Sequence, residues 1–309
     1  MCSSDLKDQL AAYRLISILC NQSKTSRHAT MSVPERNVAN TLEADLNYLI
    51  PNGTESAPVR VQIKDGRMTP TASWQEAGFE LVKHASKVSN WDDDAEVARV
   101  HYRELVDFAL KETGADVATI GSHIKRNPTE AAKHSDLAPI TFVHSDFAPS
   151  YGEVIRTRHE DLASMPDLVI GQKRPGEQIP NLRLATRILI LQFWRNLGPT
   201  KMDLPIAFCD PRSISVNALR YLPVQDYAGS GTFFEAVGVE SQQTTQHDWR
   251  YFPEMMRDEM VVFRTFDTER QENQLPDWTP HSAFRDPEVK LGEPSRSSIE
   301  CRVHCFFFE

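Results

Sequence analysis

The chain has 309 residues, of which 40% are hydrophobic and 25% charged, so it can bury a sizeable core without disulfides or a structural metal. Its formal net charge of −9 argues against a nucleic-acid or membrane-surface partner, because both attract basic surfaces. Five widely spaced cysteines without a CxxC pair indicate reduced thiols in a cytoplasmic protein and exclude a zinc ribbon or a thioredoxin motif.

Residues 1–30 differ in character from the rest of the chain. Their apolar run at 15–19 is far shorter than the roughly 20 residues that a bilayer requires. Asp5 and Asp8 precede this run, unlike the basic start of a signal or transit peptide. We expect residues 1–38 to be a loosely ordered extension, and whether residues 1–30 belong to the native protein stays open. Residues 39–309 are expected to form one domain, with its barrel core at about 115–309.

From residue 74 to Gly114 the apolar residues recur at helical spacing, as in Val97, Val100 and Leu105. Gly114 stands in the usual position of a helix stop. After it come short β-type runs separated by Pro, Gly, Asp and Asn, with one helical candidate at about 160–168. The β-type runs are residues 117–120, 140–143, 188–194, 206–209, 260–266 and 299–308.

This order of elements predicts an α+β protein in which N-terminal helices back a double-stranded β-helix, the jelly-roll or cupin type of barrel. Alternating βαβ units and a glycine-rich phosphate loop are absent from the sequence, which argues against a Rossmann or P-loop enzyme. A Gly-x-Ser-x-Gly elbow is also absent, which argues against a hydrolytic triad.

His144 and Asp146 stand two residues apart after an apolar run. In a strand, residues at this spacing point to the same face. One imidazole and one carboxylate on a rigid strand supply two-thirds of the 2-His-1-carboxylate triad that binds iron(II) and leaves positions open. Taken alone, the pair is more often an ordinary His-Asp contact at a strand end.

His281 follows a strong strand pattern, an interval and Pro280, which is the order in which a distal histidine reaches the metal in such barrels. Arg296 and Ser298 then share one face at the start of the last strand. A guanidinium can grip a carboxylate with two parallel hydrogen bonds, and a hydroxyl can add a third. Each piece alone has a structural explanation, but their order is the layout of a 2-oxoglutarate oxygenase.

Four further polar residues are candidates for the substrate pocket: Trp194, Arg195, His247 and His123. A tryptophan in a strand is more often part of the core. For His247, a role in capping a loop explains the sequence as well as a role in the substrate pocket does.

The chain resembles a fungal and bacterial hydroxylase/desaturase family over about residues 40–309. This family includes aspergillic-acid hydroxylase, a cephalosporin methoxylation protein and a meroterpenoid endoperoxidase. The motifs that carry the resemblance are His101-Tyr102, Glu112-Thr113-Gly114-Ala115, His144-Ser145-Asp146, Trp194-Arg195-Asn196-Leu197, Phe208-Cys209-Asp210-Pro211-Arg212-Ser213, Pro280-His281-Ser282-Ala283-Phe284 and Arg296-Ser297-Ser298-Ile299-Glu300-Cys301-Arg302. The resemblance implies a double-stranded β-helix, iron(II), 2-oxoglutarate and dioxygen, and the oxidation of a secondary metabolite by hydroxylation, desaturation, cyclisation or peroxidation.

Carried over residue by residue, the resemblance makes His144, Asp146 and His281 the iron ligands, and Arg296 with Ser298 the clamp for 2-oxoglutarate. The spacing of 15 residues from His281 to Arg296 is longer than in plant-type relatives, so Arg302 on the same strand is a rival clamp.

Two alternatives come from other classes of protein. A cupin-like isomerase or hydrolase would use the same three ligands but form no succinate. A catalytically silent barrel would only bind a small molecule or a partner, and its three candidate ligands would not converge. The substrate, the reaction outcome and the existence of a homodimer stay open.

Overall fold

The computed structural model describes residues 40–308, apart from 54, 70, 71, 161–164, 243, 291 and 293. The extension expected at residues 1–38 lies outside this range. Among the described helices, none combines the length and the apolar character needed to cross a membrane.

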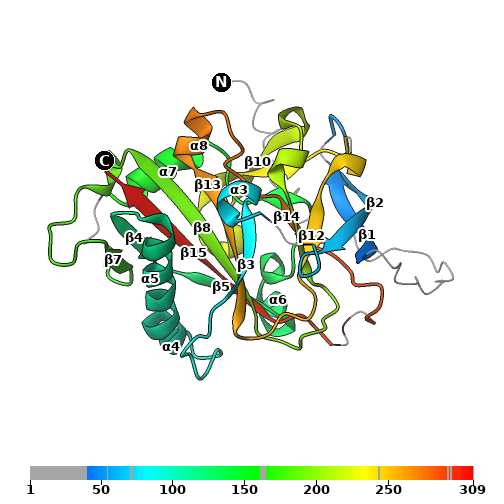
Figure 1. Cartoon of the computed structure of the whole chain (residues 1–309), viewed down its shortest axis with the longest axis horizontal. Helices are drawn as coiled ribbons and strands as arrows, with labels where there is room; N and C mark the ends of the chain where they lie inside the picture. Colours follow the sequence, from blue (N-terminus) through cyan, green and yellow to red (C-terminus); the bar gives the residue numbers. More distant parts are fainter. Residues whose placement is uncertain are drawn as a thin grey trace.

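Two sheets face each other and form a barrel that is open at its ends (Figure 1). The first has eight strands in the order β1-β2-β12-β9-β14-β6-β11-β10. Its strands are β1 (Thr41–Leu49), β2 (Ser56–Asp65), β12 (Trp249–Tyr251), β9 (Ile206–Cys209), β14 (His281–Ala283), β6 (His144–Ser145), β11 (Phe233–Val239) and β10 (Leu219–Gln225).

The second sheet has seven strands in the order β3-β13-β8-β15-β4-β7, and β5 also pairs with β15. Its strands are β3 (Phe79–Lys83), β13 (Glu259–Asp267), β8 (Arg187–Asn196), β15 (Ser298–Phe307), β4 (Val117–Ile120), β7 (Val169–Gln172) and β5 (His123–Arg126). The two sheets confirm the predicted double-stranded β-helix.

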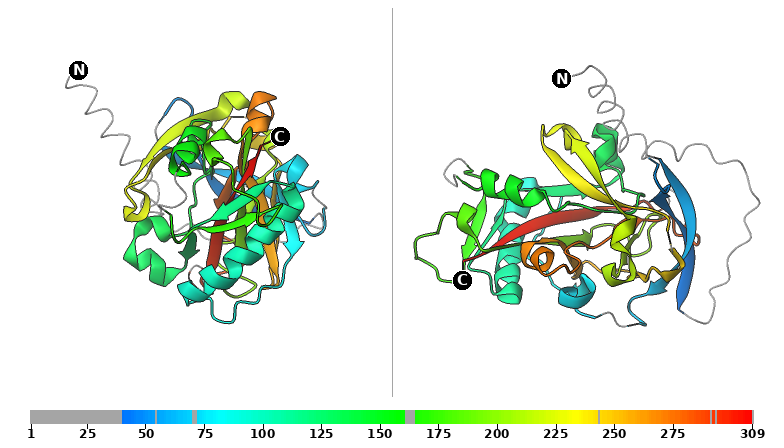
Figure 2. Two further views of the ribbon diagram at one scale, coloured as in Figure 1. Left: turned by 90° about the vertical axis from the view of Figure 1, so that its left-hand side faces the viewer. Right: turned by 90° about the horizontal axis from the view of Figure 1, so that it is seen from above.

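The α-helices are short and lie outside the barrel. They are α3 (Trp74–Ala77), α4 (Asp94–Glu96), α5 (Tyr102–Thr113), α6 (Pro128–Lys133), α7 (Tyr151–Arg158) and α8 (Thr268–Glu272), and a π-helical turn (Val97–His101) joins α4 to α5. Single 3₁₀ turns are Ser135–Leu137, Leu182–Leu184, Pro211–Ser213, Val216–Ala218, Tyr227–Gly229 and Thr244–Gln246. Figure 2 shows α5 at the opposite end of the molecule from β1 and β2.

Three sequence expectations need correction. Of the helix expected at about 160–168, residues 161–164 lie outside the described residues, and residues 160 and 165–168 are not helical; the helix of this region, α7, ends at Arg158. The stretch from residue 74 is not all helical, since β3 (Phe79–Lys83) interrupts it and pairs with β13. In the run 140–143 only Phe142 makes a β-bridge, and the paired strand β6 begins one residue later at His144.

Helix α5 covers the outer face of the seven-stranded sheet. Its Leu105, Val106 and Ala109 pack in one core cluster with Cys301, Val303 and other outward residues of β15. Gly114 ends α5 with φ 70°, a left-handed conformation that glycine adopts without strain, as expected.

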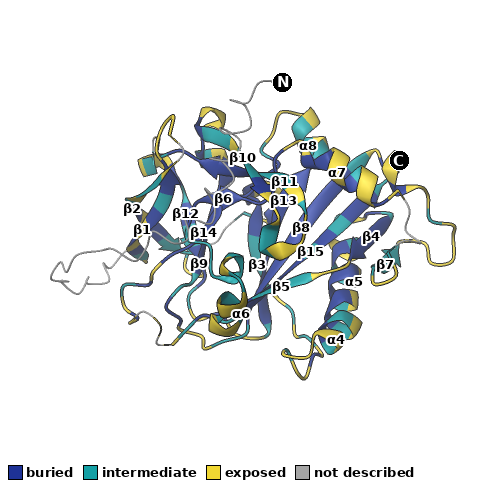
Figure 3. Cartoon of the chain, turned by 180° about the vertical axis from the view of Figure 1, so that it is seen from behind, coloured by how far each residue is buried: buried dark blue, intermediate teal, exposed yellow. Residues whose placement is uncertain are grey.

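Side chains of β15 alternate between this outer core and the space between the sheets. Ile299, Cys301, Val303 and Cys305 face α5, so that Ser298, Glu300, Arg302 and His304 face inward. Figure 3 shows β8 and β15 as mainly buried, while exposed residues gather on helices and loops. A row of polar residues therefore lines the interior of an otherwise apolar barrel.

Candidate metal centre

His144, Asp146 and His281 converge inside the barrel. One ligand atom from each lies within 4.8 Å of the others, and the three residues are only 4–8% exposed. Strand pairing causes the convergence, because His281 on β14 stands directly opposite His144 on β6. Asp146 directly follows the last residue of β6, so it continues the line of this strand in the eight-stranded sheet.

Backbone carbonyls fix the orientation of both imidazoles. Nδ1 of His144 lies 2.7 Å from the carbonyl oxygen of Phe142, and Nδ1 of His281 lies 3.0 Å from that of Thr279. A carbonyl only accepts hydrogen bonds, so each Nδ1 carries the proton and each Nε2 keeps its lone pair. The two Nε2 atoms lie 3.9 and 4.0 Å from Oδ1 of Asp146.

The electrostatics suit a cation. Burial, with His281 as the next cause, lowers the pKa of His144 to about 4, so its imidazole is neutral near pH 7. Burial opposes ionisation of Asp146, but Arg302 and the two histidines outweigh it and lower the pKa of its carboxyl group. Oδ2 of Asp146 is buried without a hydrogen-bond partner in the described structure.

These three residues fit a divalent metal ion. Two donors about 2.1 Å from one ion lie about 3 Å apart at a right angle, so each Nε2 would need to move only about 1 Å closer to Oδ1 of Asp146. Two nitrogens and one carboxylate are the ligand set of non-haem iron(II) centres. The unpartnered oxygen of Asp146 would gain the partner that a buried carboxylate requires.

Aromatic rings surround the imidazoles. The ring centroid of Phe263 lies 5.0 Å from that of His281, and Phe208, which contacts Phe263, lies 6.1 Å from it. Phe142 stacks parallel to His144 at 6.2 Å. These rings restrict the movement of the ligands and keep bulk water away from the centre.

A large cavity opens from the centre. Its volume is about 1000 Å³, at the upper end of the range for small-molecule sites, and His144, Asp146 and Arg302 line its inner end. Phe147, Tyr151, Phe234 and other apolar residues form much of the wall. His123, a candidate from the sequence, lies on this lining and bonds Asp94 at 3.1 Å.

The two candidate arginines occupy different places. A guanidinium nitrogen of Arg302 lies 3.3 Å from Asp146 and faces the cavity. Arg296 does not line the cavity; its guanidinium lies 5.0 Å from the ring centre of Trp194, and its Nε donates to Oγ of Ser298 at 3.0 Å. Arg296 is 4% exposed and makes no ion pair within the described residues.

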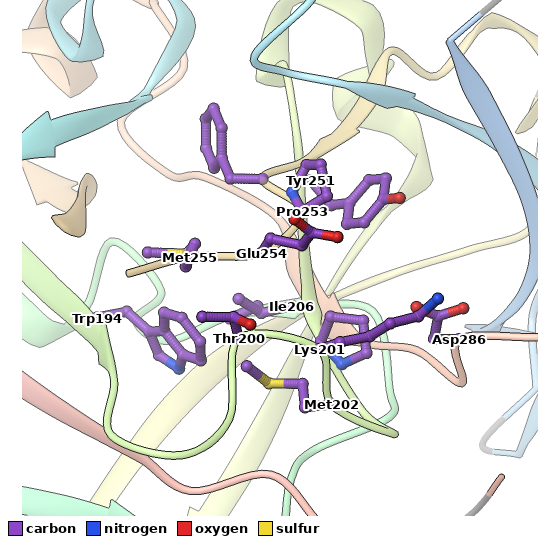
Figure 4. A pocket seen from close by; sticks show the side chains of 12 residues that line it. Trp194, Thr200, Lys201, Met202, Ile206, Tyr251, Pro253, Glu254, Met255 and Asp286 are labelled. Carbon is purple, nitrogen blue, oxygen red and sulfur yellow. The ribbon is translucent and has the colours of Figure 1, made fainter. Parts of the chain in front are cut away.

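The other pocket candidates lie away from the cavity. Trp194 lines a second pocket of only about 30 Å³ (Figure 4), which has room for little more than a water molecule. Arg195 points to the opposite face of β8, where it donates to the carbonyls of His84 and Arg257. His247 bonds the hydroxyl of Tyr48 at 2.9 Å, inside the outer core of the eight-stranded sheet.

Sequence reasoning missed several residues of the interior. Glu300 receives hydrogen bonds from Arg126 and Gln192, and His304 lines the cavity. The signal was present, because polar residues alternate with Ile, Cys and Val along 298–305. Such alternation in a buried strand marks a polar inner face.

Comparison with known proteins agrees with this geometry. The family model described as "Oxidoreductase/YMDC permease-like domain" matches residues 30–306. Hydroxylase/desaturase CTB9 of Cercospora beticola is 29% identical, covering 75% of this chain and 70% of the relative. Alpha-ketoglutarate-dependent dioxygenase phiK of Fungal sp. (strain ATCC 74256) is 26% identical, covering 86% and 96%.

Among solved structures, the iron and alpha-ketoglutarate-dependent endoperoxidase NvfI superposes with a TM-score of 0.70. The superposition covers 87% of this chain and 99% of NvfI, at 21% sequence identity. This likeness shows the fold.

Proposed function

This chain belongs to the oxidoreductase family matched over residues 30–306, and within it to the hydroxylase/desaturase group of iron(II)- and 2-oxoglutarate-dependent dioxygenases; from this premise we propose that His144, Asp146 and His281 hold the iron. The observation that carries this proposal is the convergence of two proton-free Nε2 atoms on a buried carboxylate that has an unpartnered oxygen.

The chain is an enzyme that uses iron(II), 2-oxoglutarate and dioxygen to oxidise a small molecule. The bound metal and co-substrates supply an oxidant that removes hydrogen from a C–H bond, with succinate and carbon dioxide as co-products. We place the substrate in the cavity of about 1000 Å³ beside His144 and Asp146 and propose that it is a secondary metabolite.

The residues around the ligands have distinct tasks in this proposal. Arg302 keeps the carboxylate of Asp146 ionised and directs it, since its guanidinium lies 3.3 Å away. The carbonyls of Phe142 and Thr279 hold the imidazoles in the tautomer that a metal requires. Phe208 and Phe263 limit the access of water.

For the far carboxylate of 2-oxoglutarate we propose Arg296 with Ser298. A buried guanidinium without an anion is costly, and within the described residues Arg296 pairs with no carboxylate, whereas Arg302 lies beside Asp146. The bond from Arg296 to Ser298 presents a guanidinium and a hydroxyl together, the donors that a dicarboxylate needs. An incoming anion would compensate this buried charge.

The metal proposal is tested by anaerobic addition of iron(II) and 2-oxoglutarate, recording the weak visible charge-transfer band. We expect the band in the wild type and in His134→Ala, a control at a half-buried histidine that does not line the cavity. His281→Ala should lose it. An undiminished band in His281→Ala would refute the assignment of this ligand.

The clamp is tested with Arg296→Lys and Arg302→Lys, because lysine keeps the charge but loses the two-pronged geometry. We expect Arg296→Lys to raise the KM for 2-oxoglutarate by at least tenfold, which corresponds to about 1.4 kcal/mol. Arg302→Lys should mainly weaken iron binding through Asp146. The reverse pattern would assign the clamp to Arg302.

We also propose a cytoplasmic location. Cys209, Cys301 and Cys305 are buried and unpaired, as expected for thiols in a reducing compartment.

A further inference from the structure

His304 is a polar residue in the cavity to which the proposed chemistry gives no task. It lies two residues beyond Arg302 on the inner face of β15, so the two side chains leave the strand about 6.7 Å apart. Its side chain lines the cavity, and within the described structure its ring makes no hydrogen bond.

The surroundings of His304 are mainly apolar. Ile190 and Phe306 flank it in the sheet, and both belong to an apolar cluster with Phe147 and Tyr151. Burial lowers the pKa of His304 well below its ordinary value, and His159 and Arg158 add to the effect. The half-buried ring is therefore neutral and offers one N–H donor and one acceptor nitrogen to a ligand in the cavity.

The neighbouring His159 cannot provide them. Its Nδ1 lies 3.0 Å from the carbonyl of Ile155 and therefore carries the proton. Its Nε2 lies 3.3 Å from the hydroxyl of Thr119 and accepts from it. Both nitrogens are thus used, and His159 meets His304 only edge to face, with ring centroids 5.2 Å apart.

Arg158, at the end of α7, is the second polar feature of this wall. Four other basic side chains line the cavity, and each has a carboxylate within 4 Å: Lys125 with Asp94, Lys133 with Glu130, Arg126 with Glu300 and Arg302 with Asp146. Arg158 has no such partner among the described residues, although it lines the same cavity. Arg158 is exposed, so an anionic group at this wall would meet a solvated guanidinium that has no carboxylate partner among the described residues.

We propose that His304 is a substrate-positioning residue that binds an oxygen atom of an otherwise apolar substrate, and that Arg158 strengthens the contact when this oxygen belongs to a carboxylate. The inference rests on the proposed function and specifies its substrate class. The apolar body would lie against Phe147, Tyr151 and Phe234, and its anchored oxygen would hold a C–H bond about one strand step away toward the metal centre.

The test uses three probes that share one apolar body: naphthalene, 2-naphthol and 2-naphthoate. Their affinities for the full chain, free of iron and 2-oxoglutarate, are measured by fluorescence titration. The readout is the affinity of each oxygenated probe divided by that of naphthalene, because this ratio cancels changes in the apolar wall. His304→Leu should lower both ratios by about 3- to 10-fold, the effect of one lost hydrogen bond.

His304→Gln keeps a donor and an acceptor and should restore most of the ratio, which a purely structural role of the ring would not produce. His134→Leu, the same substitution at a half-buried histidine that does not line the cavity, should leave the ratio unchanged. Arg158→Gln should lower only the 2-naphthoate ratio. A thermal unfolding curve confirms that each variant is folded.

Ratios that stay within twofold of the wild type in folded His304→Leu, or that fall equally in His134→Leu, would overturn the proposal. An unchanged 2-naphthoate ratio in Arg158→Gln would overturn the carboxylate contact. Because these titrations need no metal, they are independent of succinate formation. If His304→Leu lowers the affinity ratios but the wild type forms no succinate, only the proposed function is refuted. If the wild type forms succinate but His304→Leu leaves the affinity ratios unchanged, only this inference is refuted.

Discussion

Arg126 on β5 connects several parts of the barrel, and its replacement should be among the most destabilising single changes in this chain. Its Nε donates to Glu300 at 2.7 Å, one NH₂ group to the carbonyls of Asp136 and Ala138 at 2.6 and 2.8 Å, and the other to the hydroxyl of Tyr227 at 2.7 Å. Arg126→Met keeps the length of the side chain but removes every donor.

The cost comes from the groups that lose their partner. Removing one partner of a buried ion pair costs about 3–5 kcal/mol, and each carbonyl that loses its donor adds about 1 kcal/mol. The carbonyl of Asp136 keeps the hydroxyl of Tyr227 as a donor, so only the carbonyl of Ala138 loses its partner, and we expect a loss of about 4–6 kcal/mol in the free energy of unfolding. Adding Glu300→Gln should recover about 2–3 kcal/mol, because the double variant leaves no uncompensated carboxylate.

Equilibrium urea unfolding of the metal-free protein, followed by circular dichroism and tryptophan fluorescence, measures these values. Lys133→Met is the control, since its exposed pair with Glu130 should contribute less than about 1 kcal/mol. The reasoning is refuted if Arg126→Met loses less than about 2 kcal/mol, or if the double variant is less stable than Arg126→Met.

Three further predictions concern the metal, the pH and one glycine. Iron(II) or manganese(II) at about 100 times its Kd should stabilise the wild type by about 2.7 kcal/mol in anaerobic thermal unfolding, and His281→Ala should show no such gain. Burial lowers the pKa of His247 to about 4, so the unfolded chain binds the extra proton between pH 6.5 and 4. This group alone should reduce stability by about 3 kcal/mol as the pH decreases through this window. His101 and His144 titrate in the same window, so His247→Gln should make the pH dependence measured by urea unfolding less steep without abolishing it. Gly238 pairs with His144, and a Cβ there would lie 2.6 Å from Leu49 and 3.0 Å from Phe142. Gly238→Ala should therefore weaken the metal affinity measured by competition with a chelator. Gly176→Ala strains the backbone at an exposed residue with φ 89° outside the cavity, and it should leave that affinity unchanged.

The sequence predicted the chemistry of the centre better than its surroundings. The proposed metal ligands have characteristic residue types and spacings, as in His144-x-Asp146, and such a pattern can be recognised in the sequence. The pairing of His144 with His281 could not be read from the chain, since it depends on how two strands far apart in sequence meet. The prediction of the barrel succeeded because short apolar runs with Pro and Gly punctuation are local features.

Errors arose where tertiary contacts decide. Arg195 was a pocket candidate through its neighbour Trp194, but alternation along β8 sends it outward, to carbonyls that only the folded chain brings together. His247 likewise bonds Tyr48, a partner 199 residues away. The sequence pattern did not predict α7 (Tyr151–Arg158), although Pro149-Ser150 directly before it is a start signal for a helix.

His144 and His281 lie in the eight-stranded sheet, and Asp146 directly follows its strand β6. His304 lies on β15 of the other sheet, and Arg158 lies on α7 outside both sheets. The residues proposed to select the substrate can therefore change while the proposed metal ligands and Arg302 stay the same. For an engineer, His304 and the α7 side of the cavity are the natural positions for a focused library.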